Sequence, residues 1–194
     1  MELQHVNVKL LLQDSGETDL EPLIPVFHSW IQNRVFPELL LDIADYRHVY
    51  AGPGVVLIGH EANYSVDNTN NRLGVRYNRK EVLNGTNQDR LVQATHAALA
   101  ACERLESEPR LAGRLRFNGQ EMEIFVNDRL IAPNRASTRD TFHAELESFC
   151  ETVFPDSEIS LSYGDDPRRL FAVSVKASRP YSVADLLANL SNPG

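Results

Sequence analysis

The chain has 194 residues, of which 42% are hydrophobic and 24% are charged, and 19 basic against 27 acidic residues give a formal net charge of −8. This composition is typical of a globular protein and excludes collagen-like, coiled-coil and wholly disordered chains. A negative average field repels phosphate backbones and anionic membranes, so we expect neither nucleic acid nor a membrane as a partner. We expect a single domain over residues 1–194, with a weak internal division near residues 107–113.

The compartment is predicted from the N-terminus and the cysteines. The first residues contain no basic region followed by an apolar stretch and a cleavage site, and no run approaches the roughly 18 apolar residues of a membrane span. Cys102 and Cys150 each lie on the apolar stripe of an expected helix, where a thiol packs as a small hydrophobe. We therefore expect a cytoplasmic protein with reduced thiols.

The first third of the chain predicts a β-α-β segment. Residues 3–12 alternate between apolar and polar side chains, which is the period of a half-buried strand. Asp19 is placed to cap a helix that runs to about residue 35, and the prolines of its first turn favour a start nearer Leu23. The sequence LLLDIAD, residues 39–45, then predicts a short strand.

From residue 54 onward, the same plan of two strands followed by a helix is expected three times. In the first unit, a four-residue loop at Asn68–Asn71 places Tyr64 opposite Val75, and the helix covers about residues 88–106.

The second unit contains Asn118-Gly119, the pair that favours a type I′ hairpin turn. Closing the hairpin there pairs Leu115 with Met122 on one face and oppositely charged side chains on the other, so one register satisfies both faces. Ser137 or Thr138 can cap the helix that follows.

The third unit pairs Leu161 with Val173 and ends in a short helix over about residues 182–190. All three hairpins keep one apolar and one polar face. We therefore predict an α+β fold, in which three β-hairpin–helix units and the N-terminal β-α-β segment build a mostly antiparallel sheet. Helices cover one face of this sheet, and the polar face meets water or a partner.

His60 and Glu61 are charged or titratable residues within an otherwise apolar run. We expect His60 on the core side of the first hairpin, where a histidine usually has a structural role. Adjacent side chains of a strand point to opposite faces, so Glu61 cannot share one site with it.

A metal-assisted hydrolase is one alternative. Asp45, His48 and His60 are its candidate metal ligands, and Asp42 or Glu61 is its candidate base, because carboxylates and imidazoles suit a divalent metal and acid/base chemistry. No HExxH or CxxC motif supports this site. We therefore expect no cofactor, and a bound divalent metal is the alternative.

A basic cluster gives the candidate binding residues. Arg72, Arg76 and Lys80 share one face of an expected strand, and Tyr64 lies near them in the hairpin. Such charges often protect an edge strand from pairing. The alternative is a site for an anion or an acidic partner, to which tyrosine would add contact surface.

These structural assignments account for nearly every candidate functional residue, and the sequence has neither GxSxG nor a glycine-rich phosphate loop. We therefore favour a non-catalytic binding or assembly module over an enzyme. It would use the polar face or an edge of its sheet to bind a protein partner or a second copy of itself. A small-molecule sensor with a pocket between helices and sheet is the other alternative.

Overall fold

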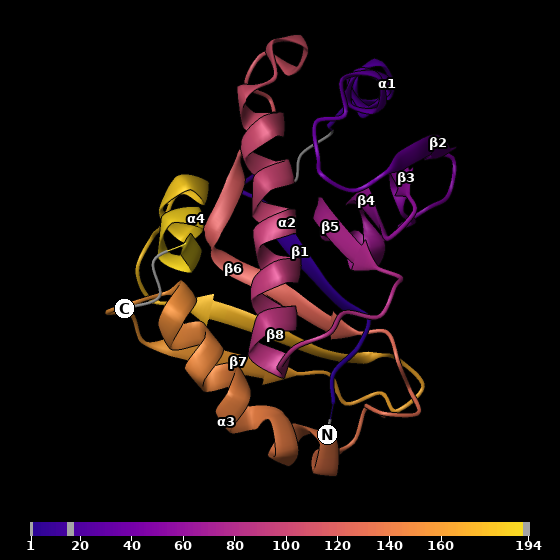
Figure 1. The fold of residues 1–194 in the computed structure, drawn as a ribbon. Helices are drawn as coiled ribbons and strands as arrows, with labels where there is room; N and C mark the ends of the chain where they lie inside the picture. Colours follow the sequence, from indigo (N-terminus) through magenta and orange to yellow (C-terminus); the bar gives the residue numbers. More distant parts are fainter. Residues whose placement is uncertain (1, 15–17, 192–194) are drawn as a thin grey trace.

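The computed structural model describes residues 2–14 and 18–191. In these residues, eight strands and four helices follow one another along the chain (Figure 1). They are β1 (Val6–Leu12), α1 (Leu23–Asn33), β2 (Leu40–Tyr46), β3 (Gly54–Gly59), β4 (Ala62–Asp67), β5 (Gly74–Arg79), α2 (Asn87–Ser107), β6 (Phe117–Val126), α3 (Ala136–Val153), β7 (Ile159–Tyr163), β8 (Phe171–Ala177) and α4 (Val183–Ser191).

All eight strands form one antiparallel sheet in the order β2-β3-β4-β5-β1-β6-β8-β7. Strand β1 lies inside the sheet between β5 and β6. It therefore joins the parts of the chain before and after residues 107–113, which contain a short 3-10 turn at Pro109–Leu111. The α+β class and the mostly antiparallel sheet expected from the sequence are confirmed.

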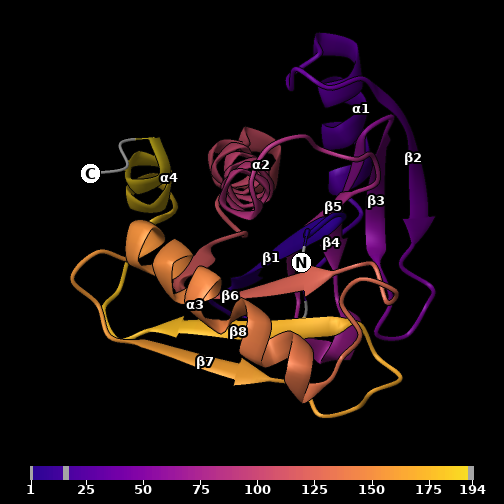
Figure 2. The same ribbon diagram turned by 60° about the horizontal axis from the view of Figure 1, so that its bottom comes forward.

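The helices lie on one side of this sheet (Figure 2). Helix α2 packs on β1 and β5, α3 on β7, α4 on β6, and α1 on β2. Thr86 and Asp89 form a capping box that begins α2, and the buried stripe of α2 includes Leu91, Ala98 and Leu105. The core lies between this helical layer and the apolar face of the strands.

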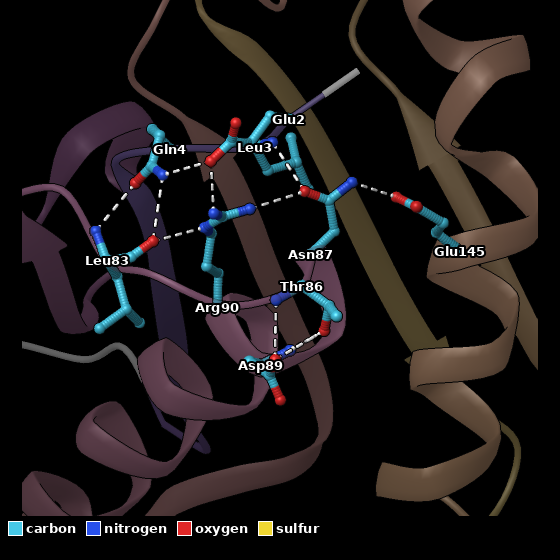
Figure 3. A network of polar contacts seen from close by, with 9 residues as sticks. All are labelled: Glu2, Leu3, Gln4, Leu83, Thr86, Asn87, Asp89, Arg90 and Glu145. Carbon is cyan, nitrogen blue, oxygen red and sulfur yellow. Dashed lines mark hydrogen bonds and ion pairs between the residues drawn. The ribbon is translucent and has the colours of Figure 1, made fainter.

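A polar network fixes the N-terminal segment against α2 and α3 (Figure 3). Arg90 is 4% exposed and donates to Glu2 Oε1 over 2.5 Å. Asn87 accepts from the backbone of Leu3 and donates to Glu145 on α3, over 2.7 and 2.8 Å. The charged groups of this network satisfy one another, so it holds the segment before β1 in place.

Two hairpin registers differ from the predicted ones by two residues. Tyr64 pairs with Tyr77 rather than Val75, because the chain between β4 and β5 includes a 3-10 turn at Thr69–Asn71 that lengthens the connection. Leu161 likewise pairs with Val175. Since each shift is even, the predicted inward and outward faces are kept.

The predicted hairpin at Asn118-Gly119 is wrong, and the second unit therefore has one strand. Strand β6 continues through this pair, with Leu10 of β1 opposite Met122 and Leu12 opposite Phe117. A move of two residues along β1 thus corresponds to a move of five residues along β6, so the extra residues of β6 form a bulge. A Cβ at Gly119 would lie 2.0 Å from the carbonyl oxygen of Tyr181, so glycine allows a close backbone approach there.

Candidate functional site

The sheet face that points away from the helices carries a row of polar side chains. Six strands contribute one residue each in register: Ser65 on β4, Arg76 on β5, Lys9 on β1, Glu123 on β6, Ser174 on β8 and Ser162 on β7. The sequence predicted this polarity but also predicted contact with water. The centre of the row is instead buried, with Lys9 1% and Glu123 8% exposed.

An open cleft of about 760 Å³ lies on this face. Its floor includes Arg76, Glu123, Phe125 and Ser174, and its rim is made by the turn after β4, the loop after β6 and the loop between β7 and β8. Arg169 donates to Asn70 Oδ1 over 2.9 Å, which joins two of the rim segments. Segments far apart in the sequence therefore share one cleft.

Two of the three cations near the cleft floor have acidic partners. Lys9 Nζ lies 2.5 Å from Asp67 Oδ1, and burial lowers the pKa of Lys9 although this carboxylate opposes the shift. Arg72 contacts Glu121 over 2.5 Å and Glu123 over 2.6 Å. These pairs offset the desolvation of buried charges.

Arg76 differs from both. It has no ion pair in the described part of the chain, and its Nε is buried without a hydrogen-bond partner. Its guanidinium lies 4.6 Å from the ring centroid of Phe125, a cation–π contact. Burial lowers the pKa of Arg76, while the charges of Asp67 and Glu123 oppose this shift. A half-buried cation therefore lines the cleft with part of its hydrogen-bonding capacity unused.

The candidate metal ligands are not brought together. Asp45 pairs with Val55 at the start of β3 and His48 follows β2, whereas His60 lies in the turn that follows the end of β3. The core-side position expected for His60 is wrong: it is exposed, and Val55 and Leu57 are the buried residues of that strand. The pleat of β3 is thus opposite to the predicted one.

The candidate carboxylates already have local partners. Arg47 binds both oxygens of Asp45 and holds the pKa of that carboxyl at about 2. Asp42 accepts from the backbone of Ile43, and Glu61 accepts from Arg79 over 3.1 Å. Within residues 2–14 and 18–191, no three His, Cys, Asp or Glu side chains form a group arranged to hold a metal ion.

Of the four predicted binding residues, only Arg76 lines the cleft. Tyr64 is 2% exposed on the helix-covered face, where its hydroxyl donates to Glu38 and its ring stacks on Phe36. Arg72 is engaged by two glutamates, and Lys80 donates to the carbonyl of Gly59.

Sequence reasoning missed Phe125 and the rim arginines as members of the same site. The alternation of β6 contained the signal for Phe125, but the wrong hairpin removed β1 as its neighbour. The arginines Arg168 and Arg169 are recognisable in the sequence as a basic pair, but their position over β6 depends on long-range strand pairing.

Both thiols are buried, as their positions on apolar helix stripes predicted. Cys102 and Cys150 are free and buried, and burial raises the pKa of the Cys150 thiol to about 12. Such a thiol is a poor nucleophile at neutral pH. Among the helices that the structure describes, none combines the length and apolar character needed to cross a membrane.

Comparison of the chain with known protein families and with curated proteins finds no match. Any proposal for function therefore rests on the geometry of the cleft.

Proposed function

We propose that this protein is a non-catalytic binding module that takes an anionic ligand into the cleft on the polar face of its sheet. The observation that carries the proposal is the state of Arg76, a half-buried arginine whose Nε is buried without a partner and whose guanidinium has no ion pair in the described residues. The hydration that such a group loses is normally replaced by a carboxylate or phosphate. A ligand anion would supply the missing partner.

The charges around the cleft favour an anion. Each acidic side chain of its lining has a cation beside it: Glu123 contacts Arg72, Asp165 contacts Arg139, and Asp166 contacts Arg168. Two rim arginines, Arg129 and Arg169, have no ion pair within the described ranges. The cleft is thus locally basic in a chain with a net charge of −8.

A carboxylate is the anion that best suits Arg76. A guanidinium presents two parallel N–H groups that match the two oxygens of a carboxylate, and such paired contacts are among the strongest hydrogen bonds in proteins. Small organic acids and acidic segments of a partner protein share this group. Two buried, unpaired cysteines suit a reducing cytoplasm as the place of binding.

Isothermal titration calorimetry tests the proposal with acetate, hexanoate, inorganic phosphate and a short acidic peptide. Arg76→Met keeps an unbranched, flexible stem and removes the charge and the hydrogen-bond donors. We expect the affinity of the best ligand to fall about tenfold to a hundredfold, because hydrogen bonds to charged groups contribute about 1.5–3 kcal/mol.

Arg47→Gln is the matched control, because Arg47 is already bound by Asp45 and does not line the cleft. We expect it to change affinity less than twofold. The proposal fails if no anion binds the folded protein, or if Arg76→Met binds the ligand as tightly as the unchanged chain does.

A further inference from the structure

Three asparagines form a second row on the polar face, next to the row that contains Arg76. Asn7 on β1 pairs with Asn78 on β5, and Asn78 pairs with Asn63 on β4. Successive strands lie about 4.8 Å apart, so the three side chains follow one another across the sheet at that spacing.

The amides of this row lack partners. Both polar atoms of Asn7 and the Oδ1 atoms of Asn63 and Asn78 are buried, and none has a hydrogen bond within the part of the chain described. The three amides therefore do not bond to one another. A buried polar group without a partner destabilises the fold by about 1–3 kcal/mol. Four such atoms in one row therefore indicate a partner that the chain itself does not supply.

Arg76 and Phe125 line the cleft beside Asn7, the β1 end of this row. They lie on β5 and β6, the two neighbours of β1, and their contact at 4.6 Å passes over β1. Phe125 is directly opposite Asn7, whereas Arg76 is opposite Lys9, two residues further along. Moving the Arg76 side chain off the ring would open the row to the cleft at Asn7.

The chemistry of the row favours hydroxyl groups. A hydroxyl both donates and accepts, and an amide offers both functions at once. A metal cation is disfavoured despite the three amide oxygens, because Lys9 and Arg76 occupy the adjacent row.

From this juxtaposition, we infer that the ligand is a polyhydroxylated carboxylate, of the sugar-acid class. Its carboxylate pairs with Arg76 and its hydroxyls bind the amides of Asn7, Asn78 and Asn63. This assignment rests on the proposed function, because Arg76 holds the carboxylate in both.

Titration calorimetry with three probes of equal chain length tests the inference: gluconate has a carboxylate and hydroxyls, hexanoate has only the carboxylate, and sorbitol has only hydroxyls. We expect gluconate to bind at least about tenfold more tightly than hexanoate, which corresponds to one or two additional hydrogen bonds, and sorbitol to bind more weakly than both.

Variants test which residues bind the hydroxyl groups and which bind the carboxylate of the ligand. Asn7→Leu removes the amide at the β1 end of the row at similar volume, and we expect it to abolish the preference for gluconate while hexanoate binds as before. Asn78→Ser serves the same purpose with a smaller polar side chain if the leucine variant does not fold. Asn33→Leu, an exposed asparagine at the end of α1, is the matched control and leaves the preference unchanged.

The outcomes separate this inference from the proposed function. Equal binding of gluconate and hexanoate, both lost in Arg76→Met, overturns the sugar-acid assignment and keeps the anion site. Failure of both acids to bind overturns the sugar-acid assignment, and failure of acetate, phosphate and the acidic peptide as well overturns the anion site. A crystal structure of the gluconate complex in which water alone occupies the asparagine row and Arg76 still lies on Phe125 also overturns the assignment.

Discussion

On the helix-covered face of β1, Val8 and Leu10 are 0% and 1% exposed, and on the opposite face Asn7 and Lys9 are 0% and 1% exposed. The two faces are equally buried, but the apolar side chains gain free energy by leaving water and the polar ones lose it unless they find partners. Lys9 has Asp67, and Asn7 has none. Burial alone therefore does not mark the core: the polar face contains one satisfied structural pair and one unsatisfied row.

The largest expected effect comes from breaking the ion pair between Lys9 and Asp67 on the polar face. Lys9→Ala leaves Asp67 buried without its cation, and we expect the free energy of unfolding to fall by about 3–5 kcal/mol. Leu10→Ala on the other face is expected to lose about 2–5 kcal/mol, so the two faces should be comparably important for stability. Urea denaturation measures both.

The double variant Lys9→Met/Asp67→Leu is the control for this pair. We expect it to recover much of the loss, because it replaces both charges with apolar groups instead of leaving one unpaired. A loss below about 1 kcal/mol in Lys9→Ala would show that Asp67 is satisfied without Lys9.

The next expected effect is a gain in the free energy of unfolding, and it tests the difference between the paired Lys9 and the unpaired Asn7. In the protein without ligand, Asn7→Leu removes two buried amide atoms that lack partners, and we expect the free energy of unfolding to rise by about 1–2 kcal/mol. Chemical denaturation of the unliganded variant measures this gain. A destabilised but folded variant would mean that bound water already satisfies the amide.

The smallest effect concerns Glu38, a polar group set against the helix-covered face. Burial raises the pKa of Glu38, and the hydrogen bond from Tyr64 opposes that shift. A folded-state pKa above the unfolded value of 4.5 makes the contribution of this carboxyl to stability greatest below pH 4.5, and the contribution is lost as pH rises through the folded-state pKa.

Glu38→Gln keeps an oxygen that accepts from Tyr64 but cannot ionise. We therefore expect its melting temperature to decline less than that of the unchanged chain between pH 4 and 7, which thermal unfolding at several pH values would measure. Parallel declines in the two proteins would contradict the role given to Glu38.

The sequence predicted which face of the sheet a side chain lies on better than it predicted which residues pair across strands. Side-chain alternation assigned Leu161 and Tyr64 to the core side even though both registers are shifted by two residues, because an even shift preserves the face. The turn preference of Asn118-Gly119 failed because β1 pairs with the whole length of β6, a long-range contact that local sequence does not contain. His60 was misplaced because the expected strand ran straight through residues 60 and 61, whereas the chain turns there between β3 and β4, which pair with each other.

The candidate site was predictable only in part. Arg76 was recognisable as a strand residue on a polar face. Phe125 and the asparagine row required knowing that β5, β1 and β6 are neighbours, and this order brings together residues separated by more than a hundred positions, as Asn7 and Phe125 show.

The central position of β1 also sets an order for folding during synthesis. Val6 pairs with Val126, 120 positions later, so β1 remains an edge strand until β6 has left the ribosome. A charged side chain, lysine above all, is one of the devices by which edge strands avoid pairing with other chains. Before β6 arrives, Lys9 is such a charge on β1, and we expect the side chain that forms a buried ion pair in the finished sheet to oppose pairing of the nascent strand with other chains.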